Sequence, residues 1–155
     1  MRKIQKGQTL IETLSALAII SIVIVAIATS VTTSLSNATF NQNQTLATKY
    51  AQQGAELVTE MRDTSFANFL NYTATNYCLA SGQTTLTAAP PTGCTVNIGN
   101  TFVRSVQITQ AGCAANVAKV VVAVSFTNSK CQTGTYCHSQ ADTFCLSTKN
   151  PVQAP

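Results

Sequence analysis

LIETLSALAIISIVIVAIA, residues 10–28, is the most apolar part of this chain of 155 residues. Its nineteen residues would form a helix about 28 Å long, at roughly 1.5 Å per residue, which matches the hydrocarbon core of a bilayer. Because three cations precede it (Arg2, Lys3 and Lys6), the positive-inside rule predicts that the N-terminus stays in the cytoplasm. A secretory signal has a shorter apolar core, but small residues between 26 and 30 leave ordinary signal cleavage as an alternative.

The chain as a whole is poor in charged residues. Only 9% of all residues are charged and 45% are hydrophobic, whereas an ordinary soluble domain has about 25% charged residues. The net charge of +4 includes the three N-terminal cations, and six cations and five anions remain beyond them. The length suffices for one small domain. We therefore expect no basic surface for binding nucleic acid.

Side chains suited to catalysis are scarce. The chain has one histidine, and its carboxylates are Glu12, Glu56, Glu60, Asp63 and Asp142. The three acids between 56 and 63 recur at helical spacing, which is typical of a solvated helix face. No nucleophile elbow, P-loop or dinucleotide-binding glycine pattern is present. The sequence therefore predicts a protein that is not an enzyme, with no catalytic residues, no metal and no cofactor.

Glu12 is unusual because it lies near the start of the apolar segment. A carboxylate in hydrocarbon is costly and usually functional. A purely structural explanation exists, since Thr9 and Glu12 have the spacing of a capping box, with Thr9 as the N-cap residue. In that position the acid would also face the positive end of the helix dipole.

The residues around Glu12 resemble a known leader. KGQTLIE (residues 6–12), followed by TLSALAII (residues 13–20), is similar to the leader and first helix of type IV prepilins and pseudopilins. The resemblance implies that prepilin peptidase cleaves after Gly7 and that the new N-terminal residue, Gln8, is methylated. It also implies that Glu12 neutralises the amine of a neighbouring subunit. Gln8 departs from the phenylalanine usual at that position.

The next part of the chain favours a continuous helix. Residues 29–45 are weak helix formers but contain no proline or glycine, and apolar residues then recur at helical spacing up to Met61. A helix over about 10–62 would be roughly 80 Å long. Gly54 would either weaken it or allow a strand to approach closely. The resemblance implies the same arrangement: a leader (1–7), a long helix (8–63, with 8–29 in the membrane or filament core) and a globular head (64–155).

The head is expected to be a small antiparallel sheet packed on this helix, which makes the fold class α+β. Strands are predicted at 102–109, 117–127 and 143–148, with a hairpin turn at 111–116 between the first two. The aromatic connection at 66–77 is expected to pack under the helix, and residues 81–93 form a polar loop.

Six cysteines lie in the second half of the chain, which in an exported protein indicates a disulfide framework. Their fifteen possible connectivities cannot be resolved from sequence, but locality favours Cys78 with Cys94 and Cys131 with Cys137, which leaves Cys113 with Cys145. The competing interpretation is a metal site formed by Cys131, Cys137, His138 and Cys145. Its spacings lack the close pairs of structural zinc sites.

The sequence thus predicts a minor pilin or pseudopilin of a type IV pilus-like or type II secretion-like filament. Its partners would be other pilin subunits, prepilin peptidase and the inner-membrane assembly machinery. It would span the inner membrane once before joining an extracellular filament. One alternative is an uncleaved membrane anchor that presents an extracellular binding domain. Another is a DNA-uptake pilin, whose head cations would be Arg104, Lys119, Lys130 and Lys149.

Overall fold

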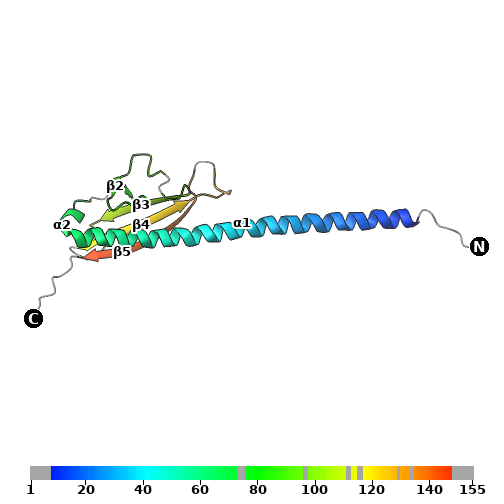
Figure 1. Ribbon diagram of the computed structural model, residues 1–155, viewed down its shortest axis with the longest axis horizontal. Helices are drawn as coiled ribbons and strands as arrows, with labels where there is room; N and C mark the ends of the chain where they lie inside the picture. Colours follow the sequence, from blue (N-terminus) through cyan, green and yellow to red (C-terminus); the bar gives the residue numbers. More distant parts are fainter. Residues whose placement is uncertain are drawn as a thin grey trace, which may run out of the picture. The chain divides into compact units, whose positions relative to one another are not determined.

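The computed structural model describes residues 8–72, 76–95, 98–110, 113–114, 117–128, 130–132 and 135–147. One long N-terminal helix packs on a small antiparallel sheet (Figure 1). Three disulfides are present. The chain divides into two compact units, Met1–Asn41 and Gln42–Pro155. The elements are α1 (Gln8–Thr64), α2 (Phe66–Phe69), β1 (Asn76–Cys78), β2 (Thr87–Ala88), β3 (Phe102–Thr109), β4 (Val117–Phe126) and β5 (His138–Ser147).

The helix α1 extends two residues beyond the predicted range at each end. Its first turn contains no acidic residue, because it begins at Gln8 and Glu12 lies in the second turn. The predicted capping box is therefore wrong, since Thr9 is already inside the helix. At the other end Ser65 is extended and caps α2 by accepting a hydrogen bond from the Asn68 backbone N–H.

The sheet has the strand order β2-β1-β3-β4-β5, and every neighbouring pair is antiparallel. The predicted meander of three strands is confirmed by β3, β4 and β5, and β3 has the predicted limits. The predicted turn at 111–116 lies mostly outside the described residues. The sequence analysis missed β1 and β2, which are only two or three residues long and have little room for a periodic pattern.

The prediction for β5 was wrong at its start, because the strand begins at His138 rather than residue 143. Its first five residues are mostly polar and small, which are weak strand formers. They nevertheless pair in continuous register with β4, from His138 opposite Phe126 to Asp142 opposite Val122. Pairing with an already buried strand overrides local propensity here.

The core of the second unit lies between the sheet and the part of α1 that belongs to this unit. Val58 of α1 is fully buried in one cluster with Val106, Ile108, Val120 and Val122 of the sheet. Buried and half-buried residues alternate along the whole of β4, so one face of this strand points to the helix.

Gly54 explains how closely the helix approaches the sheet. A Cβ atom at this position would lie 2.7 Å from Val122 Cγ1 and 3.0 Å from Arg104 Cδ. Of the two interpretations of this glycine, the structure therefore supports close approach of a strand.

The aromatic connection after α1 packs into the core, as predicted. Phe69 and Tyr77 are buried, and Phe66 and Tyr72 are partly buried against the same cluster. Neighbouring rings are in contact, with centroids 6.5 Å apart for Phe69 and Tyr72 and 5.1 Å apart for Tyr72 and Tyr77. These rings close the end of the core.

Candidate functional site

The N-terminal segment of α1 carries the residues that the sequence analysis singled out. α1 begins at Gln8, the residue that cleavage after Gly7 would make N-terminal, whereas Gly7 itself lies outside the described residues. Glu12 follows four residues later and is exposed. It is the only acid between residues 8 and 55.

Around Glu12 the helix surface is almost entirely apolar. Thirteen large apolar side chains of the first unit are exposed: Leu10, Ile11, Leu14, Leu17, Ile19, Ile20, Ile22, Val23, Ile24, Val25, Ile27, Val31 and Leu35. By length and composition α1 can cross a membrane. An exposed apolar surface of this extent indicates that lipid or another protein covers it in the functional state.

Many hydroxyl groups along α1 are satisfied by the helix itself. Thr13 Oγ1 donates to the Leu10 carbonyl oxygen at 3.0 Å, and Ser21 Oγ donates to the Leu17 oxygen at 2.8 Å. The same bond to a carbonyl three or four residues earlier is made by Ser15, Thr29, Thr32, Thr33, Thr39, Thr48, Thr59 and Thr64. These hydroxyls therefore need no partner outside the helix, which lowers the free-energy cost of placing them in an apolar environment.

Comparison with known proteins identifies this segment. Residues 2–28 match the family described as the prokaryotic N-terminal methylation motif, which is the type IV prepilin-type leader. No curated protein and no solved structure matches the chain. The motif indicates a type IV pilin-like precursor. It implies processing by prepilin peptidase and assembly into a filament, and with the apolar helix it is consistent with an inner-membrane anchor.

In the second unit, Arg104 is the charged residue that the structure buries most completely among those described. Its side chain is 2% exposed. The guanidinium donates three hydrogen bonds to carbonyl oxygens: Nε to Leu79 at 2.9 Å, Nη1 to Tyr50 at 3.2 Å and Nη2 to Ala80 at 3.1 Å. Burial lowers the pKa of Arg104, because the charged form loses hydration. Arginine nevertheless remains protonated at any physiological pH.

Arg104 thus joins three parts of the unit: α1, β3 and the segment after β1. The sequence analysis treated it as a candidate surface cation. Its position in the strand could have revealed the burial, because it alternates in phase with Phe102, Val106 and Ile108, which all point to the core.

The other candidate cations do not form one surface with Arg104. Lys119 lies on β4 among the half-buried residues of the opposite sheet face, and Lys130 is exposed in the β4–β5 connection. Lys149 lies outside the described residues. The described cations therefore do not support a DNA-binding face, which requires several cations on one surface.

The three disulfides are those that locality favoured. Cys78 is bonded to Cys94, Cys113 to Cys145 and Cys131 to Cys137. The first ties β1 to the end of the polar loop, and the second ties the segment after β3 to the edge strand β5. Each bond therefore attaches a connecting segment to the sheet or closes a loop on itself.

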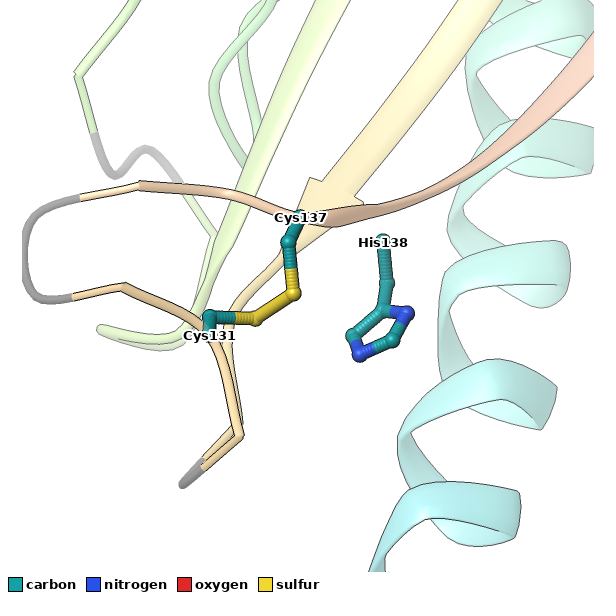
Figure 2. Close-up of side chains that lie close together, drawn as sticks. All are labelled: Cys131, Cys137 and His138. Carbon is teal, nitrogen blue, oxygen red and sulfur yellow. A yellow bond between two sulfur atoms is a disulfide. The ribbon is translucent and has the colours of Figure 1, made fainter.

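The cysteines considered for a metal site are divided between two of these bonds. Figure 2 shows the Cys131–Cys137 disulfide with the His138 ring beside it, and the three potential ligand atoms lie within 4.8 Å of one another. Cys145 belongs to a different disulfide. Because a thiolate, not a disulfide sulfur, binds metal, these sulfurs are not ligands in the oxidised protein. His138 instead stacks on Phe126, with ring centroids 5.3 Å apart.

The acids between 56 and 63 are exposed on α1, as predicted for a solvated helix face, and this face borders a groove. Glu56, Glu60 and Asp63 line a groove of about 620 Å³ together with Asp142 of β5. The sequence could not indicate this, because Asp142 is about eighty residues away along the chain and lies just before the predicted start of its strand.

Proposed function

We propose that this protein is a structural subunit, a minor pilin or pseudopilin, of a type IV pilus-like or type II secretion-like filament. The carrying observation is the prepilin-type leader at residues 2–28 on a helix whose apolar side chains are exposed. A subunit that first lies in a bilayer and then packs in a filament needs such a helix, since both environments cover the apolar surface. A major subunit would have the same properties.

In this proposal Gly7, Gln8 and Glu12 act in sequence. Prepilin peptidase cleaves after Gly7 on the cytoplasmic side and methylates the amine of Gln8. The cationic amine must then enter an apolar bundle, where an unpaired charge costs at least several kcal/mol. Glu12 of an adjoining subunit supplies the compensating carboxylate. The remaining partners would be the inner-membrane assembly machinery and other pilin subunits, with no role for nucleic acid.

N-terminal sequencing and intact mass of the membrane-extracted protein test this proposal. The expected mature chain begins at Gln8 and carries a methylated amine. A Gly7→Val variant should remain uncleaved in the membrane, whereas the neighbouring Lys6→Gln variant serves as the control and should still be cut. A mature start near residue 31 would mean ordinary secretion and would overturn the proposal.

The competing function is that of an uncleaved anchor presenting an extracellular binding domain. It requires neither cleavage after Gly7 nor a carboxylate at residue 12. An intact N-terminus in wild-type membranes, with no material in the sheared filament fraction, would favour this alternative.

A further inference from the structure

The strand β5 forms one edge of the sheet. It pairs with β4 over all ten of its residues, from His138 to Ser147, and no described strand pairs with its other side. In an antiparallel pair, alternate residues direct their backbone N–H and C=O groups away from the partner, so this edge offers a row of donors and acceptors. Natural edge strands are usually protected by lysine, proline, a bulge or a covering element. β5 contains no lysine, arginine or proline, and its register with β4 is continuous.

An acidic groove lined by residues of α1 and β5 lies beside this edge. Its carboxylates are Glu56, Glu60, Asp63 and Asp142, which are all the acidic side chains after Glu12. Half-buried Ala55 and Phe144 supply apolar surface. Asp63 pairs with Arg62 at 2.6 Å. Among the described residues, no cation forms a salt bridge with the other three acids.

The carboxylates are not arranged to stabilise the helix. Glu56 and Glu60 are four residues apart on α1, and like charges at this spacing destabilise a helix. Arg62 lies at one end of the groove, where it pairs with Asp63 and donates to the Ser147 carbonyl oxygen at 3.4 Å. The described residues that line the groove include four acids and no cation, so it concentrates negative charge beside the edge of β5. Both features are complementary to one type of ligand, an extended and positively charged peptide segment.

We propose that β5 and the acidic groove together bind an extended segment of a partner protein that carries lysine or arginine at alternate positions. The segment would add a sixth strand beside β5, and its alternate side chains would point toward the groove about 7 Å apart. The helix repeats its acids at a comparable interval, since four residues of helix rise by about 6 Å. Backbone pairing would supply affinity, and the alternating cations would select the partner.

A second copy of this chain is a poorer occupant. Pairing two β5 strands antiparallel about their centres would bring the two Asp142 carboxylates close together and place the two acidic grooves side by side. Like charges that face each other across a strand pair are destabilising. The charge of the groove therefore favours a basic partner over self-association.

The test uses the full chain in nonionic detergent and a short labelled peptide of alternating lysine and valine, with binding followed by fluorescence anisotropy. We expect saturable binding that weakens with added salt. The same peptide with glutamate in place of lysine should not bind. The double variant Glu60→Gln with Asp142→Asn should bind about fivefold more weakly. Lys130→Gln, which changes an exposed charge outside the groove, is the control and should bind unchanged.

Two N-methylated peptides separate strand addition from simple charge attraction. One is methylated on its odd amides and the other on its even amides, so only one of them loses the donors that face β5. We expect one peptide to lose binding and the other to keep it. Equal binding of both, equal binding of the glutamate peptide, or a dimer joined through β5 would overturn the proposal. The result is independent of filament assembly, since it does not depend on where the mature chain begins.

Discussion

Gly54 of α1 lies directly against Val122 of β4, and a Cβ atom added to the glycine would be 2.7 Å from the valine Cγ1. The same added Cβ atom would lie 3.0 Å from Arg104 Cδ. The distance between the helix and the centre of the sheet is therefore set by the absence of a side chain at residue 54.

The first prediction follows from this contact. Gly54→Ala should lower the free energy of unfolding by about 1–2 kcal/mol, although alanine is the better helix former, because the added methyl group overpacks the core. Thermal unfolding of the full chain in detergent, followed by circular dichroism, measures the change. In a Val122→Ala background the same substitution should instead stabilise the protein. The exposed neighbour Gln53→Ala is the control, and a stabilising effect of Gly54→Ala alone would contradict the prediction.

The second prediction concerns Arg104. Arg104→Met removes three hydrogen bonds and leaves the Tyr50, Leu79 and Ala80 carbonyls without this donor, so the free energy of unfolding should fall by about 2–4 kcal/mol. Arg104→Lys should be no milder, because an ammonium group keeps the buried charge but cannot reproduce the planar arrangement of donors. Denaturant unfolding of both variants gives the comparison. Full stability of either variant would contradict the prediction.

The pH dependence of this effect is a third prediction. Because burial lowers the pKa of Arg104, the lost hydration of its charged form offsets part of the stability that its hydrogen bonds contribute. This cost is relieved only as the pH rises through the pKa of Arg104 in the folded state. That pH lies in the strongly alkaline range, since arginine stays protonated near neutrality. The stability lost in Arg104→Met should therefore be constant between about pH 5 and pH 8. A loss that changes across this interval would indicate a different titrating group.

The disulfides provide the fourth prediction. Without reductant the intact mass should be about 6 Da below the reduced value, two hydrogens for each of the three bonds. The loops they close span 6, 16 and 32 residues. In the chain-entropy model their removal lowers the free energy of unfolding by about 2, 3 and 4 kcal/mol respectively. Paired Cys→Ser variants test this order of stabilities. Six reactive thiols in the isolated protein would contradict the presence of the three disulfides.

The fifth prediction tests Glu12. Glu12→Ala should leave membrane insertion and cleavage after Gly7 intact, because removing a carboxylate makes the helix more apolar. It should largely exclude the subunit from filaments, since the amine of Gln8 in a neighbouring subunit would lose its counter-charge. Fractionation into membrane and sheared filament pools measures both outcomes. Thr13→Ala is the neighbouring control, and equal incorporation of the Glu12 variant would leave the acid without a role in assembly.

Much of the fold could be predicted because its signals are local. The long helix follows from an apolar segment and from the absence of proline, and β3 follows from alternating residues over eight positions. The first half of β5 could not be predicted, because its polar residues become a strand only by pairing with β4. The carbonyl partners of Arg104 and the position of Asp142 at the same groove as Glu60 are likewise tertiary facts. They depend on which strand lies beside which, and periodicity does not encode this.

The hydroxyl bonds along α1 have a consequence for how such a subunit moves. Because Thr13, Ser15 and Ser21 already donate to the helix backbone, exchanging lipid for protein neighbours breaks no hydrogen bond in this segment. The free energy of the exchange then depends on how well the apolar helix surface packs against lipid or against protein. A helix of this kind can exchange a lipid environment for a protein one while keeping its internal hydrogen bonds, so the exchange needs no refolding of this segment.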